Sequence, residues 1–149
     1  MLKYTIIIAL FLLVGCGGSA KLIDVTVEDT LKVYLDDYLE VTKRYKGNKV
    51  NAIKIDDSLL DENLAGYCDR HPQVGLREVR VVSQETLGVT DSVYRVLMYH
   101  EFGHCVHDLD HDDMVWIMEP VLNRNAFVVE YHWDAILNEF LDYVGDQFK

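Results

Sequence analysis

The chain has 149 residues, of which 50% are hydrophobic, a size and composition that suit a single folded domain with one core. Its 14 Lys and Arg residues are outnumbered by 25 Asp and Glu residues, which gives a formal net charge of -11. This charge repels phosphate groups, so the composition argues against nucleic acid as a partner.

The first residues differ from the rest of the chain and predict an exported lipoprotein. Residues 1–15 combine a positive charge at Lys3 with an apolar run too short for a comfortable membrane span, so they are interpreted as a signal peptide. The run ends in Leu-Val-Gly-Cys, which resembles the lipobox of bacterial lipoproteins. That resemblance implies a lipid on Cys16 and anchorage in the cell envelope, at the periplasmic face of the outer membrane or at the cell surface. The alternative is an uncleaved anchor in which Cys16 is an ordinary cysteine.

After a short tether at 16–24, the sequence predicts one domain over residues 25–149. An apolar stripe at helical spacing predicts a helix, and short runs of β-forming residues then predict strands. These elements are a helix at 25–45, strands at 50–55, 65–68 and 76–82, and a loop at 69–75. The strand at 76–82 alternates polar and apolar side chains, as expected for an edge or half-exposed strand.

The second half of the domain is predicted to contain two helices. Residues 90–92, Thr-Asp-Ser, offer side chains that cap a helix running through Cys105. An irregular segment around Met118 follows, and a final amphipathic helix is expected at 130–144. The order of helix, short strands, helix, loop and helix predicts a small α+β domain.

The segment His-Glu-Phe-Gly-His at 100–104 predicts a metal site on the second of these helices. Residues four apart lie on one helix face with Cβ atoms about 5–6 Å apart, so His100 and His104 can hold one ion between their imidazoles. Glu101 lies beside the pair, too far round to bind the ion but close enough to accept a proton from water on it. The pattern therefore predicts a hydrolytic zinc site, with a chance match on an ordinary helix as the alternative.

Two histidines leave a zinc ion short of protein ligands, and the sequence offers His107, Asp110, His111 and a later glutamate. On a straight helix His107 would lie about 10.5 Å along the axis from His100, too far for the same ion. It is interpreted as a residue that supports the ligands or ends the helix. His111 could reach the ion only if the chain turns back at 108–110, where Asp tolerates left-handed backbone.

The run HEFGHCVHDLDHDD, followed by IMEP, resembles the metzincin clan of zinc peptidases, above all small bacterial members with an HELGHC-type helix. The match covers residues 99–120. It implies a compact zincin-like fold with a small sheet, an active-site helix, a Met-turn and a C-terminal helix, and it implies a peptide or protein substrate. The residues so assigned are His100, His104 and His111 as ligands of Zn²⁺, Glu101 as general base, and Met118 in the Met-turn.

Alternatives for the site and the function remain open at this point. Asp110 is the alternative third ligand, because the more familiar metzincin pattern has its ligand at that position. Glu130 or Glu139 would instead make a gluzincin-like site. A lipid-anchored binding or exclusion factor that keeps the scaffold and cleaves nothing is a third interpretation. The presence of Glu101 favours catalysis, because a structural zinc site needs no base.

Two further assignments concern the substrate. The strand at 76–82 is the candidate for receiving an extended peptide by strand addition. Tyr131 and His132 are candidates for stabilising an oxyanion, although side chains near a helix start are more often packing or surface residues.

The two remaining cysteines, Cys68 and Cys105, predict one disulfide, because an exported protein meets an oxidising compartment. Cys105 lies about 140° round the helix from His100 and should face inward, away from the zinc side. The alternatives are a buried pair of free thiols and a Cys68 thiolate that binds zinc or acts as a latency switch.

Overall fold

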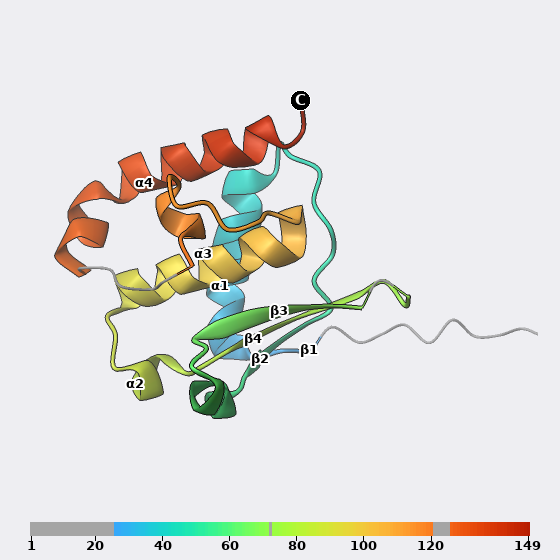
Figure 1. Ribbon diagram of the computed structural model, residues 1–149, viewed down its shortest axis with the longest axis vertical. Coiled ribbons are helices and arrows are strands. Elements are labelled where there is room, and N and C mark those ends of the chain that lie inside the picture. Colours follow the sequence, from blue (N-terminus) through green and yellow to red (C-terminus); the bar gives the residue numbers. More distant parts are fainter. Residues whose placement is uncertain (1–25, 72, 121–125) are drawn as a thin grey trace, which may run out of the picture.

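Helices α1, α3 and α4 lie on one side of a four-stranded sheet in the computed structural model, which describes residues 26–71, 73–120 and 126–149 (Figure 1). The strands are β1 (Thr26–Val27), β2 (Ala52–Ile55), β3 (Gly66–His71) and β4 (Leu76–Val81). The helices are α1 (Asp29–Thr42), α2 (Gln84–Leu87), α3 (Asp91–His107) and α4 (Ala126–Asp146), with 3₁₀ helices η1 (Asp57–Glu62) and η2 (Trp116–Met118). The α+β class predicted from the sequence is confirmed.

The strand order in the described residues is β1-β2-β4-β3. Strands β1, β2 and β4 run parallel to one another, and β3 is antiparallel to β4 at the edge of the sheet. Of the two predicted alternatives for 76–82, the edge strand is wrong, because β4 pairs with β2 on one side and with β3 on the other, and the half-exposed strand is confirmed. The prediction of a loop from residue 69 is also wrong, because β3 continues to His71.

The alternation of β4 reflects a strand with one buried and one exposed face. Val79 and Val81 are fully buried beneath the helices, whereas Glu78 and Arg80 form an ion pair on the opposite face of the sheet. One covered face and one charged face produce the same period as an edge strand does. The pattern identifies which side of the strand is buried, and it carries no information about the strand's neighbours.

Helix α3 is the central element of the fold. Thirteen of its 17 residues are buried, and it contacts β3, β4, α1, α4 and η2. Its side chains meet Tyr38 of α1 and Phe140 of α4, both fully buried, in one continuous core with the sheet residues Ile53 and Val79. A site built on this helix therefore stands on the best-packed part of the molecule.

The ends of the two long helices are set by local features. Thr90 caps α3, since its Oγ1 accepts a hydrogen bond from the Val93 N–H at 3.5 Å. Helix α4 begins at Ala126, earlier than the expected start at residue 130, and it has a non-helical residue at His132, with φ -121°. Tyr131 and His132 therefore lie within this helix at its kink and not at its start.

A disulfide joins Cys68 of β3 to Cys105 of α3, which confirms the predicted pairing. Cys105 is completely buried and faces the sheet, so the thiolate alternative for Cys68 is wrong. The bridge ties the edge strand directly to the helix that carries the predicted metal site. Cys16 and the predicted signal peptide lie outside the described residues. Among the residues that are described, no helix is both long enough and apolar enough to cross a bilayer.

Candidate metal centre

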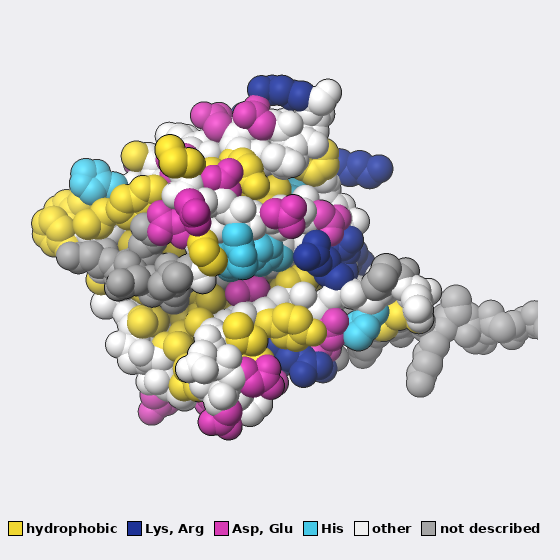
Figure 2. Space-filling model, viewed as in Figure 1, with side chains coloured by type: hydrophobic (Ala, Val, Ile, Leu, Met, Phe, Trp, Pro, Cys, Tyr) yellow, Lys and Arg dark blue, Asp and Glu magenta, His cyan; other side chains and the backbone are white. Residues whose placement is uncertain are grey.

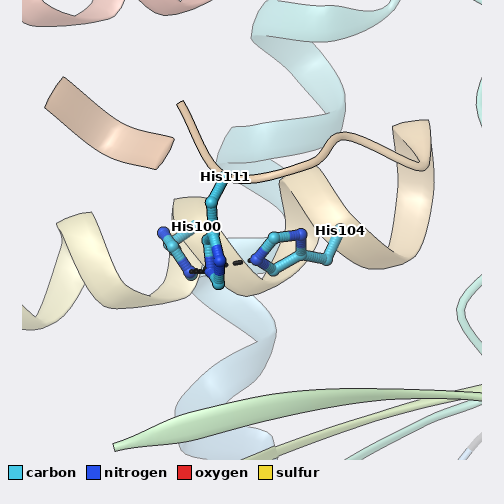
Figure 3. A group of neighbouring side chains, drawn as sticks. All are labelled: His100, His104 and His111. Carbon is cyan, nitrogen blue, oxygen red and sulfur yellow. Dashed lines mark hydrogen bonds between the residues drawn. The ribbon is translucent and has the colours of Figure 1, made fainter. Parts of the chain in front are cut away.

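Three histidine side chains converge beside helix α3 (Figure 3). His100 and His104 stand one turn apart on the helix, and His111 comes from the segment that follows it. Their candidate ligand atoms all lie within 4.8 Å of one another. The Nε2 atom of His100 is 3.0 Å from that of His104 and 3.2 Å from that of His111. The three side chains form a group that could hold a metal ion.

Backbone carbonyls orient two of these imidazoles. Nδ1–H of His100 donates to the carbonyl of Ile117 at 2.7 Å, and Nδ1–H of His104 donates to the carbonyl of Leu109 at 2.6 Å. A carbonyl can only accept, so the proton sits on Nδ1 of each neutral ring and Nε2 carries a lone pair. Burial lowers the pKa of His100 to about 4 and also lowers the pKa of His104, which favours these neutral rings.

The arrangement of the nitrogens fits a bound cation. The unprotonated Nε2 atoms of His100 and His104 cannot hydrogen-bond to each other, but they can share one positive ion. The ~2.0–2.1 Å Zn–N bonds of a tetrahedral site separate neighbouring nitrogens by roughly 3.3 Å. The separations of 3.0 and 3.2 Å at His100 lie close to that value. The donor set and its carbonyl supports therefore suit a metal bound by three imidazoles.

A left-handed residue at the end of α3 brings His111 back over the helix. Asp108 has φ 56°, and the next residue, Leu109, donates its N–H to the carbonyl of Gly103 at 3.1 Å. This is the turn that the sequence predicted at 108–110. It reverses the chain within three residues, and His111 consequently reaches the two helical histidines.

The carboxylate of Asp108 is held by residues from other elements. Arg77 donates to both of its oxygens, at 2.7 and 3.1 Å, and Asn48 donates to it at 2.8 Å. Arg77 also donates to the carbonyl of Cys105 at 2.8 Å, in the last turn of the helix. Burial opposes ionisation of Asp108, but these hydrogen bonds and the charge of Arg77 hold its pKa below its usual value. They explain how an Asp residue is maintained in a backbone conformation that favours glycine.

The side chain of Glu101 is buried beside the histidines, with 3% of its surface exposed. Burial raises the pKa of its carboxyl group to about 8. Among the described residues, none donates a hydrogen bond to its Oε2 atom. Gly66 of β3 makes room for the group, because a Cβ atom there would lie 2.6 Å from Oε1 of Glu101. A buried carboxyl group in a cleft, with one oxygen that has no partner among the described residues, is a candidate for proton transfer.

Met118 lies under the site and is fully buried. A Cβ atom at Gly103 would lie 2.8 Å from the Met118 sulfur, so the glycine between the two helical histidines allows the methionine to pack against the helix. The carbonyl of the preceding residue, Ile117, is the one that orients His100. The segment around Met118 thus supports the site through packing and through the backbone.

A cleft of about 550 Å³ opens in front of these groups. One wall of the cleft is formed by the edge strand β3 and the residues before it. The opposite wall is formed by the three histidines together with Glu101, Asp110 and Glu119. Figure 2 shows histidine side chains at the surface in the middle of this face, with acidic and basic side chains around them. The site is therefore open to a ligand from solvent.

The other residues considered from the sequence fall in different places. Asp110 lines the cleft but does not belong to the three-histidine group. Glu139 accepts the N–H of Trp116 at 3.0 Å, and Glu130 accepts a hydrogen bond from Ser92 at 3.2 Å, so neither joins the group. Tyr131 is exposed, and it is not among the described residues that line the cleft.

Sequence reasoning missed Gly66, Arg77 and Asn48. An isolated glycine in a strand signals close approach of another group, so Gly66 could have been singled out. No local signal connects Arg77 or Asn48 to Asp108, because the partners lie 31 and 60 residues apart.

Comparisons of the chain with protein-family models, with curated proteins and with solved structures found no match.

Proposed function

We propose that this chain is a zinc-dependent metalloendopeptidase carried on the cell envelope as a lipoprotein. The proposal is supported by three imidazoles that converge on one point, by a buried carboxyl group beside them, and by an open cleft with a free strand edge. The resemblance of residues 99–120 to metzincins agrees with it.

Zinc is the metal that this set of donors suits. Three neutral imidazoles are a common ligand set of catalytic zinc, which keeps a further position for water or substrate. In this assignment His100, His104 and His111 hold the ion, and Asp110 serves the turn that carries His111. A bound zinc ion would make nearby water more acidic and polarise a substrate carbonyl.

Glu101 is assigned as the general base. Its buried carboxyl group accepts a proton from the attacking water and passes that proton to the amine that leaves. A zinc ion bound by the neighbouring histidines would favour the carboxylate form of Glu101, whereas burial alone favours the protonated form. The packing of Gly66 against this side chain holds the base in position.

The edge strand β3 is the surface on which we expect an extended peptide to bind. Among the described residues β3 pairs with β4 alone, and it also lines the cleft. The backbone N–H and C=O groups on the outer side of an edge strand can form a ladder with a peptide backbone, as in strand addition. The substrate strand is therefore reassigned from 76–82 to β3.

The observation that carries the proposal is the position of Glu101. A metal site that only stabilises a fold, or one on a binding factor that cleaves nothing, has no use for a buried carboxyl group in the cleft. Such a group costs free energy when it has no partner, and a function in proton transfer accounts for its retention.

Lipid attachment at Cys16 is the second part of the proposal and rests on the lipobox-like segment alone. Mass spectrometry of the protein purified from membranes should find a diacylglycerol-modified Cys16 at the N-terminus of the mature chain. An unmodified cysteine would contradict it.

The activity is tested by measuring zinc in the purified protein and by digesting an unbiased peptide library with it. We expect stoichiometric zinc and cleavage that a chelator abolishes and added zinc restores. Zinc binding without cleavage of any peptide would support the binding factor instead.

A further inference from the structure

One face of β3 follows the active-site helix along its length. Gly66 lies against Glu101, Cys68 is bonded to Cys105, and Arg70 pairs with Asp108 just after the helix ends. Side chains two apart share a face of a strand, so all three β3 residues point toward α3. Arg70 consequently lies at one end of the same cleft that contains the candidate base, and it is among the residues that line that cleft.

The guanidinium of Arg70 is available to a ligand. Its side chain is 43% exposed, and its contact with Asp108 is long, at 3.3 Å. Asp108 does not depend on this contact, because Arg77 and Asn48 already donate to both of its oxygens. Arg77 differs from Arg70 in being only 20% exposed and in bonding to the helix backbone as well. Arg77 is thus part of the fold, whereas Arg70 has donors left over.

Positive charge gathers at this end of the cleft. A second hollow of about 540 Å³ adjoins Arg70, and it is lined by three cationic side chains, Lys49, Arg70 and Arg77, and by one carboxylate, that of Asp108. Figure 2 shows Lys or Arg side chains in dark blue beside the histidines. The chain as a whole has a net charge of -11, but these three cations and one carboxylate give this end of the cleft a positive local charge. Such a site attracts carboxylates and repels cationic side chains.

We propose that Arg70 is a specificity-determining residue that binds the carboxylate of an acidic side chain in the substrate. The inference rests on the proposed peptidase function of the cleft. Arg70 follows Gly66 by four positions (70 - 66), which is about 13 Å of extended strand. A peptide paired with β3 therefore presents to Arg70 a side chain a few residues away from the bond that lies over Glu101. The bidentate fork of arginine suits a carboxylate at that distance.

The test uses the full chain and pairs of blocked peptides that differ only in having Glu or Gln at one position. The Glu or Gln residue is moved along the peptide one position at a time. At one position we expect kcat/KM to be about fivefold higher for the Glu peptide than for the Gln peptide, because a half-exposed ion pair contributes about that factor. The Arg70→Gln variant should lose this preference for the Glu peptide, and the Arg70→Glu variant should instead prefer a peptide with Lys at the same position. High salt should also reduce the ratio in the unchanged protein, because it screens exposed charges.

Arg80→Gln is the matched control. It removes the same charge from the other face of the sheet, where Arg80 pairs with Glu78, so it should retain the preference for Glu. A preference that survives Arg70→Gln, or no preference at any position, would overturn the proposal.

A binding measurement separates this inference from the proposed function. The Glu101→Gln variant of the full chain should bind the fluorescently labelled Glu peptide more tightly than the Gln peptide, and adding Arg70→Gln should remove the difference. If the unchanged protein cleaves nothing but this difference in affinity is seen, the peptidase function fails and the assignment of Arg70 as a carboxylate-binding residue stands. If both members of the pair are cleaved with equal kcat/KM, or are bound with equal affinity, the assignment of Arg70 as a carboxylate-binding residue is refuted.

Discussion

The carboxyl group of Glu101 lies directly against Gly66 of the edge strand. A Cβ atom at position 66 would lie 2.6 Å from Oε1 and 2.8 Å from Cγ of Glu101, closer than unbonded atoms approach. The strand that borders the cleft therefore also fixes the position of the candidate base. The proposed substrate edge and the candidate base are in direct contact here.

Gly66→Ala should displace the Glu101 side chain. We expect a loss of about 1–3 kcal/mol in the free energy of unfolding, the usual cost of overpacking a buried position, together with a lower kcat. In a Glu101→Ala background the same substitution should cost almost nothing, because the group it collides with is gone. Urea denaturation of the four proteins of this cycle measures the coupling. Equal destabilisation in both backgrounds would show that the contact is not the cause.

The disulfide between Cys68 and Cys105 holds the edge strand on the helix. It closes a loop with a sequence separation of 37 residues, for which chain entropy predicts a stabilisation of about 4 kcal/mol. The Cys68→Ser, Cys105→Ser double variant should unfold at correspondingly lower urea concentration. A reducing agent should lower the stability of the unchanged protein and leave that of the double variant as it was. A reducing agent that destabilised both proteins equally would contradict this account.

Substitutions at His111 and at Asp110 should have different effects on zinc affinity. His111→Ala removes a proposed ligand, so zinc affinity should fall by more than about 100-fold, since losing a group that only supports a ligand already costs ~10–100-fold. Asp110→Ala leaves the three-histidine group intact and should retain stoichiometric zinc. Competition with a chromogenic chelator measures both affinities. If Asp110→Ala empties the site while His111→Ala does not, Asp110 is the ligand.

The local features of the site could be predicted from the sequence. The spacing of His100 and His104 determines that both lie on one face of a helix, and the run of Asp residues after the helix indicates where the chain can turn left-handed. Asp108 is that left-handed residue, with φ 56°. These are properties of neighbouring residues, so one segment of sequence contains all the information they need.

The features that depend on distant parts of the chain could not be predicted. Whether β4 is an edge or an internal strand depends on β2 and β3, and its alternation is the same in both cases. The bonds from Arg77 to Asp108, and from Arg70 to the same carboxylate, exist only once β3 and β4 are packed on α3. The cysteine pair was the one long-range contact that composition and compartment could anticipate.

The central claim is that Glu101 acts as the base of a zinc-dependent hydrolysis without being a ligand. The most direct measurement compares the rate of peptide hydrolysis by the unchanged protein and by Glu101→Gln at equal, measured zinc content. The amide keeps the shape of the side chain but cannot accept a proton, so we expect the rate to fall by about 10²–10⁴-fold while zinc remains bound. An unchanged rate in Glu101→Gln, or a loss of rate that is matched by a loss of zinc, would contradict the assignment of Glu101 as the base.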